Sequence, residues 1–175
     1  MNQSDLNKIE IKQGDITQLS VDAIVNAANN SLLGGGGVDG AIHNAAGPQL
    51  LEACKTLNGC ETGDAKITKG FQLKASHVIH TVGPIYSGTS EDPRLLASCY
   101  QKSLQLAQSN ALKTIAFPAI SCGVYGYPIS DACKIAVDTS LEMLPKCPNI
   151  ECVIFILFSE NDYNVYKKYI ISLTE

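Results

Sequence analysis

Apolar and polar positions along the chain form a pattern that predicts six strands. Residues 9–13 alternate between apolar and polar side chains, which is typical of a strand with one buried face. Four apolar segments are typical of strands buried on both faces, and one more polar segment is typical of a sheet edge. The buried segments are 23–28, 77–82, 114–120 and 152–158, and the edge-like segment is 65–70.

Helical patterns lie in the intervals between these strands. Asp92 and Pro93 predict a helix start, with the aspartate as the cap and the proline in the first turn. Ser130 is expected to cap a second helix, and Ser159 with Asp162 forms a capping-box pattern before a third. Strands that alternate with helices, most of them apolar throughout, predict an α/β fold with three α/β/α layers. We expect one such domain over residues 1–175.

Composition and charge exclude several classes of partner. The chain has 175 residues, 45% of them apolar, and a net charge of −4, so the basic surface of a general nucleic-acid-binding protein is absent. No apolar run approaches the ~20 residues that span a bilayer, and the polar N-terminal segment lacks a signal-peptide core. The seven cysteines form no C-x-x-C pair, which predicts reduced thiols in a cytoplasmic protein rather than disulfides or a metal site.

Two glycine-bearing loops each follow a buried strand and precede a helix. The first lies in the stretch 26–47, after strand 23–28, and the second spans residues 121–128, after strand 114–120. In open α/β sheets, ligands bind beyond the carboxyl ends of the strands, and consecutive backbone N–H groups in such turns form concave anion sites. Neither loop contains lysine or arginine, so a phosphate bound there must be held by main-chain amides.

Two well-known phosphate-binding motifs do not fit the first of these loops. Gly35, Gly37 and Gly40 match G-x-G-x-x-G, but six residues separate the strand from the first of these glycines. In a dinucleotide-binding turn the first glycine follows the strand directly. A Walker A loop needs lysine where Ala41 stands. A dinucleotide-binding oxidoreductase is therefore disfavoured.

Six motifs extend over nearly the whole chain. They are GDIT (14–17), VDAIVNAAN (21–29), GGGGVDGAIHNAAG (34–47), TGDAKITKGFQL (62–73), VIHTVGP (78–84) and FPAISCGVYGYP (117–128). Their order and spacing resemble macrodomains of the MacroD type. This resemblance implies a roughly six-stranded mixed sheet between helices, with ADP-ribose lying across the strand ends. It also implies hydrolysis of ADP-ribosyl esters, with ADP-ribosylated proteins and O-acetyl-ADP-ribose as substrates, no cofactor or metal, and a monomeric protein.

The resemblance assigns one group of residues to the adenine end. Asp15 would accept from the adenine amino group, and Ile16 would offer its backbone amide. Phe158 ends the last predicted strand and resembles the aromatic residue that stacks on adenine. Two other interpretations stay open, because an acid at a strand end is a common turn residue and phenylalanine is usually buried in the core.

A second group of residues would surround the diphosphate. The loop after strand 114–120 would wrap it through backbone amides, with Tyr125 against the distal ribose, and the glycine loop would form the opposite wall. Side chains in place of the glycines would occupy the ligand's space. A plain glycine turn is the alternative. The residues are Gly35, Gly36, Gly37, Val38, Ser121, Cys122, Gly123, Val124 and Tyr125.

Cys122 departs from the family pattern, because related loops commonly carry a hydroxyl residue at this position. It is either a small residue in place of another, or a thiol whose pKa the loop amides lower. The second interpretation would make ligand binding sensitive to oxidation.

The resemblance places catalysis on Asn29 and Asp39. Asn29 would fix the distal ribose, and Asp39 would position or deprotonate the attacking water, with the substrate's own phosphate as an alternative base. An aspartate of ordinary pKa, near ~3.9, is a weak base at neutral pH, so positioning can matter more than proton abstraction. His43 lies four residues later on the same helix face and would support Asp39. In an arbitrary protein, Asp39 would be only a helix cap.

These residues leave two functions to be separated. One is an enzyme that removes mono-ADP-ribose from acidic residues and deacetylates O-acetyl-ADP-ribose. The other is a module that binds ADP-ribose without turnover. Asn29 and Asp39, within an intact GGGGVDGAIH motif, favour the enzyme.

Overall fold

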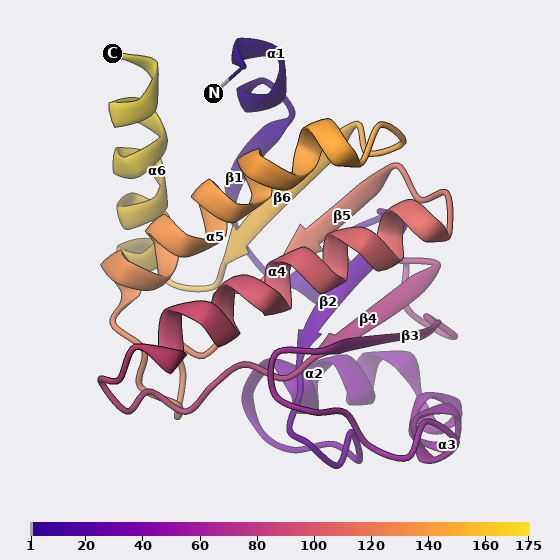
Figure 1. Cartoon of the computed structure of the whole chain (residues 1–175). Coiled ribbons are helices and arrows are strands. Elements are labelled where there is room, and N and C mark those ends of the chain that lie inside the picture. Colours follow the sequence, from indigo (N-terminus) through magenta and orange to yellow (C-terminus); the bar gives the residue numbers. More distant parts are fainter. Residues whose placement is uncertain (1) are drawn as a thin grey trace.

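The computed structural model describes residues 2–175 and contains a six-stranded sheet in the order β1-β6-β5-β2-β4-β3 (Figure 1). Five neighbouring strands are parallel, and β3 pairs antiparallel with β4 at one edge. This mixed sheet confirms the predicted fold class. The strands are β1 (Ile9–Gln13), β2 (Ala23–Ala27), β3 (Ala65–Lys69), β4 (His77–Thr81), β5 (Thr114–Phe117) and β6 (Cys152–Leu157).

Helices cover both faces of the sheet (Figure 1). Helices α2 (Gly37–Ala46) and α3 (Pro48–Lys55) pack on one face. Helices α4 (Glu91–Ser109), α5 (Ile129–Met143) and α6 (Glu160–Thr174) pack on the other. The remaining elements are short: α1 (Gln3–Leu6), η1 (Ile16–Gln18) and η2 (Leu144–Lys146). No helix in residues 2–175 is long and apolar enough to cross a membrane.

Each face of the sheet has its own apolar core, because neighbouring strand residues point to opposite sides. On β2, Ala23 and Val25 face the larger core under α4, α5 and α6, whereas Ile24 faces the smaller core under α2 and α3. All three are fully buried. A strand in the middle of a sheet, covered on both sides, is therefore mostly apolar, as the sequence pattern predicts, and in β2 the exception is the buried Asn26.

The predicted helix starts are partly wrong. Helix α4 begins at Glu91, and Asp92 lies inside its first turn rather than at the cap. Its carboxylate instead accepts from the backbone N–H groups of Ser87 and Gly88 at 2.9 and 2.7 Å. Helix α5 begins one residue before Ser130, whose side chain makes no capping bond. The predicted cap of α6 is confirmed, because Ser159 Oγ accepts from the backbone N–H of Asp162 at 3.1 Å.

The two serines provide a matched test of these helix starts. Ser159→Ala removes the N-cap hydrogen bond and should lower the free energy of unfolding by about 1 kcal/mol. Ser130→Ala should change it by less than about 0.5 kcal/mol, because the Ser130 side chain is exposed and caps nothing. Urea unfolding of both variants measures the difference, and equal losses would contradict the observed caps.

Candidate functional site

The five parallel strands end along one edge of the sheet, and the predicted site residues follow those ends in a row. Asp15 follows β1 and Phe158 follows β6, at one side of this edge. The loop of residues 121–127 follows β5, and the glycine loop of residues 28–36 follows β2, its neighbour in the sheet. The strand order therefore places the predicted adenine residues at one end and the glycine loop with Asn29 towards the other, with the loop of residues 121–127 between them.

The glycine loop leads into α2 with its backbone donors free. Helix α2 begins at Gly37 with Gly36 as N-cap and no side-chain cap. Within residues 2–175, nothing accepts from the backbone N–H groups of residues 35–39. Gly37 has φ +58°, and a side chain at Gly36 or Gly37 would point into open space. A helix N-terminus with several free donors attracts an anion.

The loop of residues 121–127 also has backbone N–H groups without acceptors within residues 2–175. Its ends are closed by hydrogen bonds from Tyr127 N–H to the Ser121 carbonyl at 2.9 Å and from Gly126 N–H to the Gly123 carbonyl at 3.0 Å. The N–H groups of residues 123–125 have no acceptor in the described chain. Val124 is fully exposed at the tip of this loop. The two loops thus present unpaired main-chain donors at adjacent strand ends, and neither carries a basic side chain.

Gly83, which follows β4, allows this second loop to pack closely. A side-chain carbon at Gly83 would lie within 2.6 Å of Ile120 and would overlap Ser121 Oγ. Ser121 is buried and has φ +67°, a left-handed conformation that its neighbours must support. The backbone N–H of Tyr86 donates to the carbonyl of Tyr125 at 2.9 Å. The segment after β4, which contains Gly83 and Tyr86, therefore packs against the loop of residues 121–127 and supports its conformation.

Asp39 is a buried carboxylate, not a helix cap. Its exposed fraction is 4%, and Oδ1 accepts from Asn26 Nδ2 at 2.9 Å. His43 Nε2 lies 3.4 Å from the same oxygen, within ion-pair distance but not aligned for a hydrogen bond. A side chain at Gly35 would come within 3.1 Å of Oδ2. Asn26, on the sheet, thus fixes Oδ1 of Asp39, while Oδ2 lies against the glycine loop.

Asn29 lies beside Asp39 across Gly35, because a side chain at Gly35 would also come within 3.4 Å of Asn29 Nδ2. Its amide donates to the carbonyl of Gly34 at 2.9 Å and accepts from Ser31 Oγ at 2.7 Å and the backbone N–H of Leu32 at 3.2 Å. Asn29 therefore shapes the glycine loop. The structure brings together the three residues for which the sequence predicts catalytic or supporting roles, Asn29, Asp39 and His43.

A buried polar chain behind Asp39 was not predicted from the sequence. Asn26 on β2 and His80 on β4 are register partners, and Asn26 Nδ2 lies 3.2 Å from His80 Nδ1. His80 Nε2 lies 2.9 Å from Thr68 Oγ1 on β3. Burial, followed by the nearby charge of His43, lowers the pKa of His80 to about 3, so the ring is neutral. The available signals were the single polar residue of β2, Asn26, and the polar residues His77, His80 and Thr81 of β4.

The adenine end is open. Asp15 is exposed, and its Oδ1 accepts from the backbone N–H and the hydroxyl of Thr17 at 2.9 and 2.7 Å, while Ile16 is buried behind it. The alternative that Phe158 is a core residue is wrong, because 86% of it is exposed. It follows the last residue of β6 and lies outside both cores. An exposed aromatic ring at a strand end is available to stack on a planar ligand.

Cys122 is not an activated thiol. Burial, and then the charge of Asp162, raises the pKa of Cys122 to about 12. Its thiol donates to the carbonyl of Ile120 at 3.5 Å. The interpretation that loop amides lower this pKa is therefore wrong, since the half-buried sulfur lies beneath the loop.

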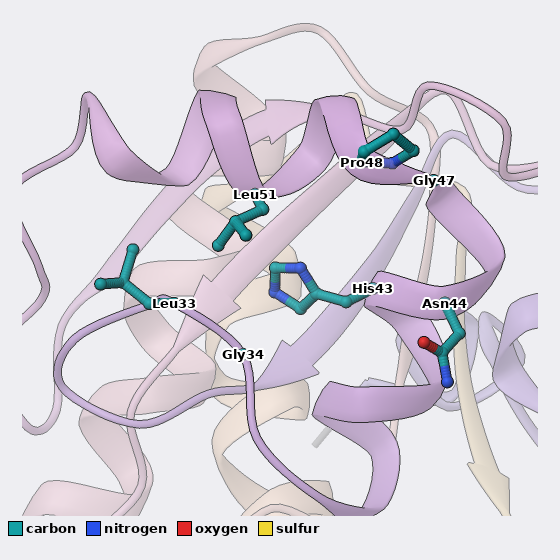
Figure 2. A pocket seen from close by; sticks show the side chains of 7 residues that line it. All are labelled: Leu33, Gly34, His43, Asn44, Gly47, Pro48 and Leu51. Atoms are coloured by element: carbon teal, nitrogen blue, oxygen red, sulfur yellow. The ribbon is translucent and has the colours of Figure 1, made fainter.

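A pocket of about 340 Å³ lies behind the glycine loop, between this loop, α2 and α3 (Figure 2). The ring of His43 points into it from α2, and Leu33 and Leu51 lie opposite that ring (Figure 2). Gly34 separates the pocket from Asn29, and a side chain at Gly34 would contact the His43 ring at 3.9 Å. His43 therefore packs between this pocket and Asp39.

The chain is similar to known proteins over most of its length. The Macro domain family matches residues 25–136. A macro domain-containing protein of Chlorobaculum tepidum is 61% identical over 157 residues, which cover 89% of this chain and 91% of that protein. The ADP-ribose glycohydrolase MACROD2 of Xenopus laevis is 57% identical over 164 residues, which cover 92% of this chain but 39% of that protein. A solved variant of the Oceanobacillus iheyensis macrodomain with ADPR has a TM-score of 0.90 and 47% identity, covering 95% of this chain and 93% of its own.

Substitutions at Gly40 and Gly123 test which glycines are required for close packing and which only border open space. A side-chain carbon at Gly40 would lie 2.5 Å from the carbonyl oxygen of Gly35, so α2 and the loop would have to separate. Gly40→Ala should lower the free energy of unfolding by about 1–3 kcal/mol. Gly123→Ala should change it by less than about 0.5 kcal/mol, because nothing lies within 4 Å of the added carbon. Urea unfolding of both variants measures this, and a fully stable Gly40→Ala would contradict the close approach.

Proposed function

The chain belongs to the macrodomain family, and from this premise we propose that it binds ADP-ribose across the carboxyl edge of its sheet and hydrolyses ADP-ribosyl esters. One observation carries the proposal: Asp39 is buried with one oxygen fixed by Asn26, while the other lies beside Gly35 and Asn29. A carboxylate and an amide are thus directed towards the same small space. Two relatives support this choice of ligand. One is named an ADP-ribose glycohydrolase, and the other is a macrodomain solved with ADPR.

In this proposal, main-chain amides hold the diphosphate. The N–H groups of residues 35–39 and 123–125 have no partners in the described chain, and their loops follow adjacent parallel strands. A diphosphate between the loops would accept from both sets of donors. Adenine would then extend towards Asp15 and Phe158, and the distal ribose towards Asn29 and Tyr125. A ligand with a base at one end and a ribose at the other matches this row of residues.

Asp39 and Asn29 would act at the distal ribose. Asn29 is fixed by its own hydrogen bonds and would orient the ribose, which lowers the entropic cost of reaching the reactive geometry. Asp39 would accept a hydrogen bond from a water molecule and direct its oxygen to the ester. The water oxygen bonds to the anomeric carbon as the bond from that carbon to the ester oxygen breaks, and the products are a carboxylate, a proton and ADP-ribose. His43 would limit movement of the Asp39 carboxylate.

The leaving group sets the substrate class in this proposal. An ADP-ribosyl ester of glutamate, aspartate or acetate releases a carboxylate, whose conjugate acid has a pKa near ~4, so it departs without a donated proton. A serine linkage releases an alkoxide, which needs a proton or a metal at departure. In this arrangement Asp39 accepts from the water molecule, so it cannot also supply that proton. We therefore propose acidic residues carrying mono-ADP-ribose, and O-acetyl-ADP-ribose, as the substrates.

Asp39→Asn tests whether the site catalyses or only binds. The amide keeps the shape of the side chain and can still accept from Asn26, so the variant should fold and retain ADP-ribose binding, measured as a thermal shift. Turnover of a glutamate-linked ADP-ribosyl peptide should fall by roughly 10²–10⁴. Asp15→Ala is the matched control and should weaken binding while keeping turnover at saturating substrate. Binding by the unaltered protein without any release of ADP-ribose would instead identify a reader module.

Peptides that carry one defined linkage each test the substrate class. Free ADP-ribose should be released from glutamate- and aspartate-linked peptides, and acetate from O-acetyl-ADP-ribose. Serine- and arginine-linked peptides should react at least roughly 10²-fold more slowly, because their leaving groups need a proton. Chromatography of the products measures each rate. Equal rates on serine and glutamate linkages would mean that the site contains a general acid.

A further inference from the structure

Asp39 is connected to the edge strand of the sheet by three polar side chains that lie under the site. Asn26 on β2, His80 on β4 and Thr68 on β3 form this chain, which crosses three neighbouring strands. Asn26 and His80 are fully buried, and Thr68 is half-buried. None of the three side chains faces the proposed ligand edge directly. This row of polar side chains can therefore influence the reaction only through Asp39.

The hydrogen-bond partners fix the protonation state of the His80 ring. The amide nitrogen of Asn26 has two hydrogens, one for Asp39 Oδ1 at 2.9 Å and one for His80 Nδ1 at 3.2 Å. Nδ1 must therefore accept, and the proton of the neutral ring is on Nε2. From there it is donated to Thr68 Oγ1 at 2.9 Å. The thiol of Cys54 lies farther from Nε2, at 3.8 Å.

The opposite arrangement is unfavourable because of the charge on Asp39. If the Asn26 amide were turned over, its oxygen would face the Asp39 carboxylate at hydrogen-bond distance, and two acceptors would be buried against each other. The Nδ1–H form of His80 would favour that turned amide, because it would donate to the Asn26 oxygen. The Thr68 hydroxyl can donate or accept, so the Asp39 carboxylate, acting through Asn26, selects the Nε2–H form, and Thr68 supplies the acceptor that this form needs.

We propose that His80, held in its Nε2–H form by Thr68, is a positioning residue for hydrolysis. It orients the Asn26 amide, which in turn fixes one oxygen of Asp39 and leaves the other directed at the glycine loop. The inference rests on the proposed function, since Asp39 is the group that it positions. A neutral ring suits this role, because a cation at His80 could not accept from Asn26 and would break the chain.

The protonation state of His80 can be measured without substrate. In the full chain with ¹⁵N-labelled histidine, long-range ¹H–¹⁵N NMR distinguishes Nε2–H from Nδ1–H, and His80→Asn identifies the His80 signals among the three histidines. We expect the Nε2–H form in the unaltered protein and a loss of that preference in Thr68→Val. An Nδ1–H form in the unaltered protein would overturn the inference, whatever the enzymatic activity.

Turnover of two isosteric variants tests the positioning role. Thr68→Val keeps a β-branched side chain on the edge strand but removes the acceptor, so kcat on the glutamate-linked peptide should fall about tenfold with an unchanged Kd for ADP-ribose. Thr68→Ser restores the hydroxyl and should restore kcat. Equal kcat for Thr68→Val and the unaltered protein would overturn the inference. No turnover by the unaltered protein would instead overturn the proposed function, so the two failures are distinguishable.

Discussion

The hydrogen bond from Asn26 to Asp39 is the interaction on which the arrangement of the site depends. A carboxylate with 4% exposure is costly unless it has partners, and this bond supplies one from the middle of the sheet. It connects α2 to β2 and so fixes where the helix begins. The glycine loop must then pass over the carboxylate, and the close approach of Gly35 and Gly40 follows from that path.

Much of the fold could be predicted, because a strand that is buried on both faces has a nearly continuous run of apolar residues. Residues 152–157 are apolar, and residues 23–27 are apolar except for Asn26, since helices cover both sides of these strands. Their predicted bounds agree with the structure to within one residue. Helix α3 was not predicted, since it is short and follows α2 directly after Gly47. The cap at Ser159 was predicted because its partner is three residues away. Asp92 was misassigned because it bonds backwards to the preceding loop.

The site was predicted only where its residues lie close together in the sequence. Asn29, Asp39 and His43 fall within fifteen residues, and the resemblance assigns each of them a role in the same site. His80 and Thr68 could not be found, because their link to Asp39 depends on the register between β2, β4 and β3. Phe158 and Cys122 show a related limit. Burial at a strand end or in a loop depends on what lies above it, and that is not visible in local sequence.

The absence of lysine and arginine from both loops has a consequence for how ligands arrive. Peptide dipoles act over a few ångströms, whereas a cluster of cations draws polyanions from beyond a Debye length of about 8–10 Å. The net charge of −4 supplies no such attraction for the chain as a whole. A site built from main-chain amides therefore selects among phosphate ligands by shape and only on contact. The other phosphates of a cell can reach such a site, and they are rejected there because they leave some of its donors unpaired.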